Sequence, residues 1–205
     1  MRSKKEPFSD PDELDFCAFR CVRQGNDIVF RALLLHEDTM TIDDPLKASF
    51  PSVTDVETRV LILGSLPGEV SLARRQYYAH PTNQFWRLIS GVIGRDLASL
   101  GYEARLSGLL TARIGLWDVI RTARRHGSLD GNIRDHSPNA LSDLLARLPA
   151  LRLVAFNGNT SSVIGRKVLS ELAGVDMLSL PSSSAAYTLP FAEKQAQWSQ
   201  LRDYL

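Results

Sequence analysis

From about residue 50 onward, hydrophobic residues in this 205-residue chain follow two alternating patterns. Short runs rich in leucine, isoleucine and valine predict buried strands, and between them apolar residues recur every three or four positions, as in helices packed on a sheet. The four predicted strands span residues 59–63, 114–120, 151–156 and 175–180. This alternation indicates parallel βαβ units, so we expect an α/β fold: a three-layer α/β/α sandwich with a central four-stranded, mainly parallel sheet.

Helical periodicity predicts helices over about 83–92, around 141–148, from the third strand to about 172, and over about 190–205. In the last helix, the spacing places Phe191 and Trp198 inward and Lys194 toward solvent. Residues 121–137 are polar and lack either pattern, so they are predicted to form a long working loop.

Residues 1–49 lack this regularity and are predicted to be an N-terminal extension of unknown role, followed by a catalytic domain over 50–205. The extension holds seven Lys/Arg and ten Asp/Glu, whereas the remainder holds seventeen and thirteen. A mildly basic domain permits nucleic-acid binding without requiring it. The arginines at 121, 124 and 125 either share a DNA-facing surface or form a solvated helix face.

Several classes of protein are disfavoured by composition. No apolar run approaches the ~20 residues of a membrane span, and acidic residues follow the basic N-terminus, so a cytoplasmic protein is expected. Cys17, Cys21 and four scattered histidines make no zinc pattern. We therefore expect no metal and no cofactor.

Small or polar residues end all four predicted strands. These are Gly64 and Ser65, Asp118, Asn157, and Pro181 to Ser183. Because the carboxyl ends of parallel strands lie along one edge, a single cleft should collect them.

Six segments, in order, resemble the uracil-DNA glycosylase superfamily, and most of all its hypoxanthine (deoxyinosine) branch: LGSLPG at 63–68, YYAHPTNQFW at 77–86, LWDV at 116–119, GSLD at 127–130, FNG at 156–158 and LPSSS at 180–184. The second segment is also similar to mismatch-specific uracil/thymine glycosylases. The resemblance implies a monomer without cofactor that flips a deaminated base from double- or single-stranded DNA and hydrolyses its N-glycosidic bond.

The resemblance also implies catalytic residues. In several branches an Asp or Asn two positions after the first motif glycine positions the water, but here that residue is Leu66, so Asn83 is the best candidate for the polar role. The alternative is that Asn83 caps a helix, although Thr82 could do so equally well. Backbone N–H groups of Ser65 and Leu66 would bind a base carbonyl or the leaving-group anion.

For base binding, Gly64 would allow close approach and Tyr78 would stack on the base. The alternative is that Tyr77 or Tyr78 is a core residue, which should hold for at least one of the two. Asp118 could read hypoxanthine, which presents an N1–H donor where adenine presents an acceptor. Asp118 could equally pair with an arginine or cap a helix. Asn157 could contact the ligand or only satisfy a turn.

The last motif implies DNA contacts. Pro181, Ser182, Ser183 and Ser184 would bind phosphates, or form a plain serine-rich loop. Relatives commonly have a proline where this chain has Ala185, so Tyr187 is our guess for the residue that enters the helix.

We therefore predict a monofunctional DNA glycosylase acting on hypoxanthine. The alternatives are a uracil or G·T/G·U mismatch glycosylase, or a non-catalytic nucleic-acid or nucleotide-binding module. Lyase chemistry would need an amine nucleophile, and Lys167 and Lys194, the only lysines from residue 50 onward, are predicted to point away from the cleft.

Overall fold

The computed structural model describes residues 44–205 in full, together with the backbone of 19–24 and 27–32. The chain divides into two compact units, Met1–Ile42 and Asp43–Leu205, so the division falls before the predicted boundary at residue 50. In the first unit, β1 (Phe19–Gln24) and β2 (Asp27–Ala32) form an antiparallel hairpin. Cys17 lies outside the described residues.

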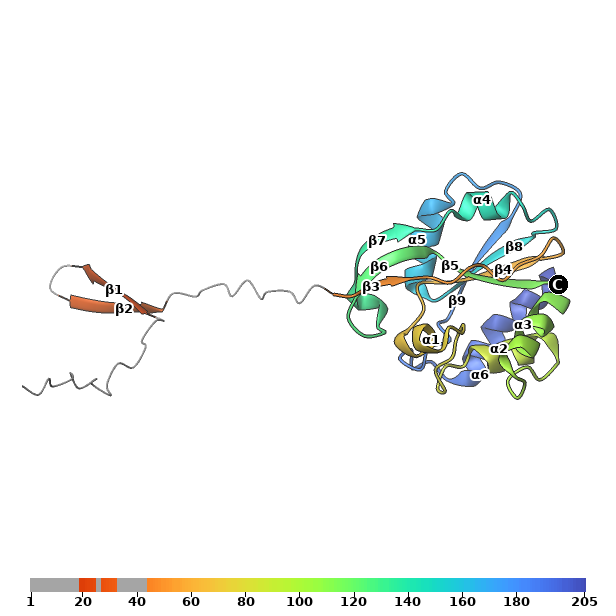
Figure 1. Cartoon of the computed structure of the whole chain (residues 1–205), viewed down its shortest axis with the longest axis horizontal. Helices are drawn as coiled ribbons and strands as arrows, with labels where there is room; N and C mark the ends of the chain where they lie inside the picture. The colour runs from red at the N-terminus through yellow and green to blue at the C-terminus, as the bar shows by residue number, and fades with distance from the viewer. Residues whose placement is uncertain (1–18, 25–26, 33–43) are drawn as a thin grey trace, which may run out of the picture. The chain divides into compact units, whose positions relative to one another are not determined.

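The predicted α/β/α sandwich with its four-stranded parallel sheet is confirmed. Its strands are β4 (Val60–Gly64), β5 (Ile114–Asp118), β8 (Leu153–Asn157) and β9 (Asp176–Leu180). They pair in the order β5-β4-β8-β9, with β4 and β8 at the centre (Figure 1). All three pairings are parallel, so every strand ends at the same edge.

Helices cover both faces of this sheet (Figure 1). The longer ones are α2 (Phe85–Ile93), α3 (Tyr102–Thr111), α5 (Asn159–Val168) and α6 (Phe191–Trp198), which continues as a 3₁₀ turn over Ser199–Tyr204. The short ones are α1 (Glu69–Arg74) and α4 (Leu141–Leu145). The sequence pattern predicted neither α1 nor α3, and it extended the helix over α4 too far.

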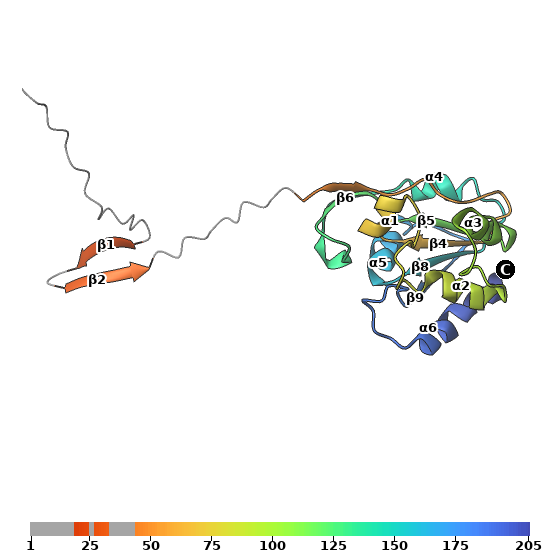
Figure 2. The same cartoon turned by 60° about the horizontal axis from the view of Figure 1, so that its bottom comes forward.

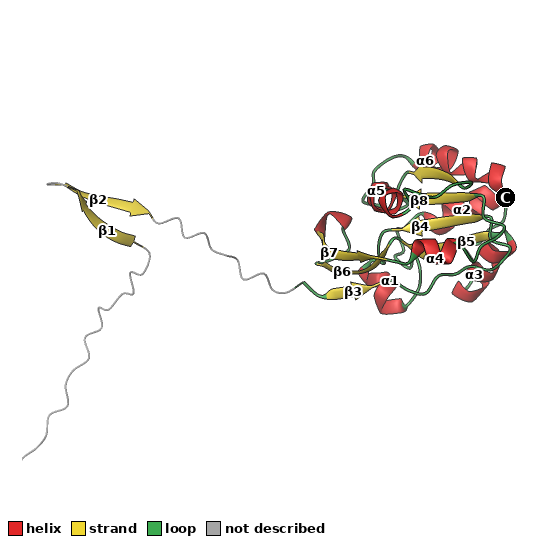
Figure 3. Ribbon diagram, turned by 90° about the horizontal axis from the view of Figure 1, so that it is seen from above, coloured by secondary structure: helices red, strands yellow, loops and turns green. Residues whose placement is uncertain are grey.

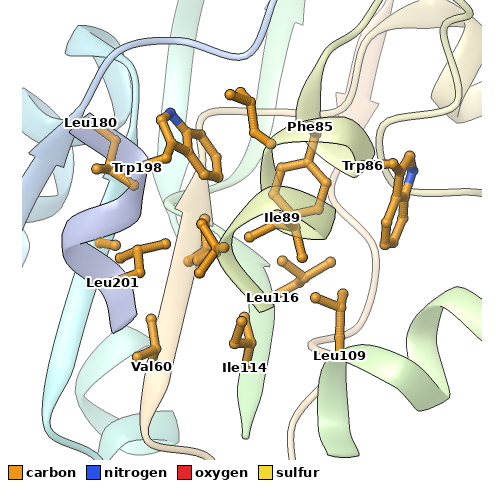
Figure 4. Close-up of a cluster of buried hydrophobic side chains, with 14 of the residues drawn as sticks. Val60, Phe85, Trp86, Ile89, Leu109, Ile114, Leu116, Leu180, Trp198 and Leu201 are labelled. Carbon is orange, nitrogen blue, oxygen red and sulfur yellow. The ribbon is translucent and has the colours of Figure 1, made fainter. Parts of the chain in front are cut away.

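Two hydrophobic clusters fill the space on either side of the sheet. Alternate residues of β4 divide between them: Val60 and Ile62 face one cluster, and Leu61 and Leu63 face the other. In the first cluster, Phe85 of α2 and Trp198 of α6 pack edge to face, with ring centroids 5.7 Å apart (Figure 4). The two helices lie side by side beneath the sheet (Figure 2).

The prediction of a long loop over 121–137 is wrong. Residues after β5 form a hairpin of β6 (Ile120–Arg125) and β7 (Ile133–Pro138), with a 3₁₀ turn at Asp130–Asn132. The strand β3 (Leu46–Ala48) adds to β6 and completes a three-stranded antiparallel sheet beside the main one (Figure 3). Residues 46–48, predicted to belong to the extension, therefore pack as part of the larger unit.

Candidate functional site

A cavity of about 510 Å³ lies at the carboxyl edge of the parallel sheet, formed by segments of residues 64–71, 77–83, 128–130 and 182–187 together with Asp118 and Asn157. Its lining includes ten of the twelve predicted site residues: Gly64, Ser65, Tyr78, Asn83, Asp118, Asn157, Ser182, Ser183, Ser184 and Tyr187. Strand ends separated by up to about 120 positions therefore meet in one site.

The two remaining predicted residues stay outside the lining. The Leu66 side chain is buried in the hydrophobic cluster that contains Leu61 and Leu63. Pro181 uses its carbonyl to accept a hydrogen bond from Trp198 Nε1 at 3.0 Å. Within residues 44–205, no hydrogen bond involves the backbone N–H of Ser65 or Leu66. The loop after β4 can thus offer the backbone N–H groups of Ser65 and Leu66 to a ligand, whereas the side chain of Leu66 is part of the hydrophobic core.

Gly64 and Asp118 lie opposite each other in the β4–β5 register, at the base of the cavity. A Cβ atom at position 64 would stand 2.6 Å from Asp118 Oδ1 and 3.2 Å from the Tyr78 hydroxyl. Only glycine leaves room for the Asp118 carboxyl and the Tyr78 hydroxyl to approach the backbone this closely.

Asp118 is 3% exposed, and its Oδ2 has no hydrogen-bond partner. Burial raises the pKa of this carboxyl to about 7, against the opposing effect of a side-chain hydrogen bond with Tyr77, and the nearby negative charge of Asp130 also raises it. In the described part of the chain, Asp118 forms no ion pair with an arginine and caps no helix. A buried acid with one oxygen left unpaired, next to a cavity, is a typical candidate for a ligand contact.

The two tyrosines have different environments. Tyr77 is buried in the core, with its hydroxyl 3.3 Å from the Pro51 carbonyl. Tyr78 lines the cavity with a positive φ of 52°, and its ring stacks on Phe85 at a centroid distance of 3.8 Å. Phe85 therefore fixes the plane of an aromatic ring on the cavity wall.

Asn157 links the end of β8 to the serine-rich loop. Its Nδ2 donates to Ser183 Oγ (2.9 Å) and to the Tyr78 hydroxyl (3.1 Å), and its Oδ1 accepts from the Ser183 N–H (2.8 Å). The side-chain amide is thus engaged within the protein. This geometry favours a role in holding Tyr78 and the loop in place.

Asn83 lies on the cavity wall just before α2. Its Oδ1 accepts a hydrogen bond from the Phe85 N–H at 3.0 Å, so it does stabilise the start of the helix. Thr82 does not take this role, because its hydroxyl pairs with His80 Nδ1 at 2.9 Å. The Nδ2 group of Asn83 is in no hydrogen bond within the described residues, and it remains available to a ligand.

Arg125 was not predicted as a site residue. It is fully buried, and its guanidinium donates to the carbonyls of Leu66 (3.2 Å), Pro67 and Gly127 (3.1 Å). Arg125 therefore belongs neither to a DNA-facing surface nor to a solvated helix face, the two alternatives that the sequence left open. These hydrogen bonds connect the loop after β4 to the β6–β7 hairpin. The loop and the hairpin together form one wall of the cavity.

The prediction that Lys194 faces solvent is wrong. Its side chain is fully buried, and Nζ donates to the carbonyls of Tyr187 (2.8 Å) and Ser184 (3.2 Å). Burial lowers the pKa of this ammonium. Helical periodicity could not identify it, because the pattern assigns charged residues to the outer face.

Among the described residues, no group of three or more His, Cys, Asp or Glu side chains could hold a metal ion. None of the helices in this part of the chain is long and apolar enough to cross a membrane.

Comparisons with known proteins identify the family of this chain. Two hypoxanthine DNA glycosylases, from Methanosarcina barkeri and Methanosarcina acetivorans, are 42% and 40% identical to this chain; each comparison covers 75% of this chain and 96% of the relative. A solution NMR structure of a Methanosarcina acetivorans protein described as a uracil DNA glycosylase superposes with a TM-score of 0.70 and 39% identity, over 78% of this chain and 99% of that one. The family model of the uracil DNA glycosylase superfamily matches residues 51–205, the same span that builds the sheet edge and its cavity, and the chain therefore belongs to this superfamily.

Proposed function

We propose that this chain is a monofunctional DNA glycosylase that hydrolyses the N-glycosidic bond of a deaminated base, with hypoxanthine as the first substrate. Two relatives at 42% and 40% identity are hypoxanthine DNA glycosylases, which supports this choice of base. Such an enzyme must take the base out of the stack and hold it in a pocket. The cavity at the sheet edge is the place where this chain can do so.

The unpaired Oδ2 of Asp118 is the strongest support for a pocket that binds the edge of a base. Asp118 is nearly inaccessible to solvent, yet its Oδ2 has no hydrogen-bond partner among the described residues. A buried polar atom without a partner is costly, so a ligand that supplies a hydrogen bond is favoured. As a carboxylate, Asp118 accepts the N1–H of hypoxanthine, where adenine offers only an acceptor.

Tyr78 supplies the stacking surface in this proposal. One face of its ring already lies on Phe85 and its hydroxyl is held by Asn157, so the ring is fixed before a base arrives. An offset stack of a base on such a ring contributes about 1–3 kcal/mol. The free N–H groups of Ser65 and Leu66 would then receive the negative charge that develops on the departing base.

The serine-rich loop is our candidate for DNA contact. Ser183 is buried and bonded to Asn157, whereas Ser182 and Ser184 are partly exposed. Tyr187 is 48% exposed beside the cavity and is a candidate to fill the space left by the flipped base. We propose that the protein acts as a monomer in the cytoplasm, on double- or single-stranded DNA.

Single-turnover assays on otherwise identical duplexes containing deoxyinosine, uracil or a G·T mismatch would test the function. Excision of deoxyinosine at the highest rate is expected. A higher rate with uracil or G·T would instead assign the protein as a uracil or mismatch glycosylase of the same superfamily. No excision from any of the duplexes, combined with measurable DNA binding, would indicate a non-catalytic module.

A further inference from the structure

The motif at 127–130 ends in an acidic residue on the cavity wall, where no role has been assigned to it. Asp130 begins the 3₁₀ turn between β6 and β7, and its side chain is 38% exposed. Its Oδ1 accepts a hydrogen bond from Ser65 Oγ at 2.8 Å, across 65 positions of sequence. Arg125 Nη1 lies 3.9 Å from the same oxygen.

These contacts fix the carboxylate in place. The hairpin that carries it is anchored by Lys47 and Arg125, both of which donate to the Gly127 carbonyl, at 2.7 Å and 3.1 Å. A carboxylate has about four acceptor positions; the Ser65 hydroxyl uses one of them and the Thr160 side chain a second. Asp130 therefore keeps acceptor capacity in an orientation that the protein sets.

Hydrolysis of a glycosidic bond needs a group that holds a water molecule and takes its proton. Leu66 has no polar atom in its side chain, and that side chain is in the core. The Oδ1 of Asn83 is already bonded to the Phe85 N–H, and an amide is a poor proton acceptor. Asp118 lies deeper, with 3% of its surface exposed, and the proposed function already assigns its carboxylate to the N1–H of the base.

We propose that Asp130 is a further catalytic residue of this glycosylase: it holds the attacking water and accepts its proton. This inference rests on the proposed function. The water oxygen forms a bond to C1′ while the bond between C1′ and the base nitrogen breaks, and the electron pair leaves with the base. The water proton passes to the Asp130 carboxylate, so the products are an abasic site and the free base anion, which later takes a proton from solvent.

A negative charge near the sugar has a second effect, because the transition state resembles an oxocarbenium ion. Burial raises the pKa of Asp130, while the hydrogen bond from Ser65 and the charge of Arg125 act in the opposite direction. The two carboxyl groups of the cavity thus lie in different environments, as expected of a pair that divides two tasks.

Asp130→Asn in the full-length protein tests the proposal. It keeps an oxygen to accept the Ser65 hydroxyl but loses the charge and the proton acceptor. The single-turnover rate on deoxyinosine DNA should fall at least ~100-fold, within the range of general base catalysis, while affinity for the same duplex changes less than ~3-fold. Asp135→Asn, an exposed change on the same hairpin, is the matched control and should keep the wild-type rate.

A rate for Asp130→Asn within about fivefold of wild type would overturn the proposal, given that the wild type excises deoxyinosine. Wild-type protein that excises no base would instead refute the proposed function.

If Asp130→Asn melts at a lower temperature than wild type, the excision rate of Asp130→Ala in sodium formate provides the deciding test. A rate several-fold higher in formate than in equal sodium chloride supports Asp130 as the base, and equal rates in the two salts would reject it.

Discussion

The side-chain nitrogen of Lys194 lies 5.3 Å from the centre of the Tyr187 ring and donates a hydrogen bond to the carbonyl of the same residue. A second bond reaches the Ser184 carbonyl. The buried lysine therefore fixes the backbone of the serine-rich loop over Ser184–Tyr187, while the Tyr187 side chain remains exposed. A buried charge bonded in this way fixes a conformation that the serine-rich sequence alone does not specify.

Lys194→Met should weaken DNA binding, because the loop loses both donors while the new side chain still fills the buried space. We expect about a tenfold increase in Kd for a deoxyinosine duplex, measured by fluorescence anisotropy, which corresponds to ~1.4 kcal/mol. Lys167→Met, on the exposed side of α5, is the control. Equal affinity of the Lys194→Met variant and wild type would show that the loop orders without the lysine.

The enzyme should leave an intact abasic site. Burial lowers the pKa of Lys194, a property of Schiff-base lysines, but both of its hydrogen bonds are committed to the loop and its nitrogen is inaccessible. Borohydride added during turnover on deoxyinosine DNA should trap no covalent complex. A trapped adduct that disappears in Lys194→Met would overturn the hydrolytic mechanism.

Two substitutions at Asn83 can separate capping from catalysis. Asn83→Ser keeps an oxygen near the Phe85 N–H but removes the free Nδ2, so the free energy of unfolding should stay within ~0.5 kcal/mol of wild type. Base excision should nonetheless fall at least ~tenfold, as when a positioned polar group is lost.

Asn83→Ala, by comparison, should lose excision and also about 1 kcal/mol of stability. Denaturant titrations and single-turnover rates measure the two effects separately. An Asn83→Ser variant with full activity would reduce Asn83 to a helix cap.

Asp118→Asn should change base selectivity. An amide can turn its NH₂ group toward the N1 acceptor of adenine, whereas a carboxylate cannot, so discrimination for hypoxanthine should weaken. The ratio of deoxyinosine to uracil excision is the measurement. An unchanged ratio would remove Asp118 from the base pocket.

The same substitution should stabilise the protein in a pH-dependent manner. Asp118 ionises near 3.8 in an unfolded chain and near 7 in the folded protein, so its contribution to stability is greatest below about pH 4 and is lost as the pH rises through 7. Asparagine avoids burial of a charge. At pH 8 the variant should be more stable by on the order of 4 kcal/mol, with little difference at pH 4, and a constant difference across this range would contradict the raised pKa.

A fragment of residues 50–205 should be less stable than one of residues 43–205. The shorter fragment lacks β3 and Lys47, whose Nζ donates to Glu69 Oε1 (2.8 Å) and the Gly127 carbonyl (2.7 Å). We expect a loss of about 2 kcal/mol in chemical denaturation, the size of a buried hydrogen bond to a charged group. Equal stability of the two fragments would support the boundary at residue 50 that the sequence pattern predicts.

The central sheet was predictable from sequence because three of its strands, β4, β5 and β8, are buried on both faces. Runs such as Val60 to Leu63 have no polar residue, and the parallel arrangement places their ends together. The convergence of Gly64, Asp118 and Asn157 in one cavity follows from that arrangement. Strand ends therefore carried most of the information about the site.

The features that sequence reasoning missed are buried charges. In β6, the buried residues are Ile120, Ala123 and Arg125, so one of the inward positions of the strand is an arginine. Periodicity assigns such a residue to the surface, and the hairpin was therefore predicted as a loop. Lys194 was misplaced for the same reason, since only the tertiary structure supplies the carbonyls that bind it.

Arg125 has a consequence for the way in which bases are told apart. By joining the carbonyls of Leu66, Pro67 and Gly127, it connects the loop with Ser65 to the turn with Asp130 before any nucleotide is present. The entropy of ordering this wall is lost during folding, and binding does not have to supply it. A base with the wrong shape or hydrogen-bonding pattern would then meet a surface that does not rearrange around it, and we expect this rigidity to contribute to the discrimination between bases.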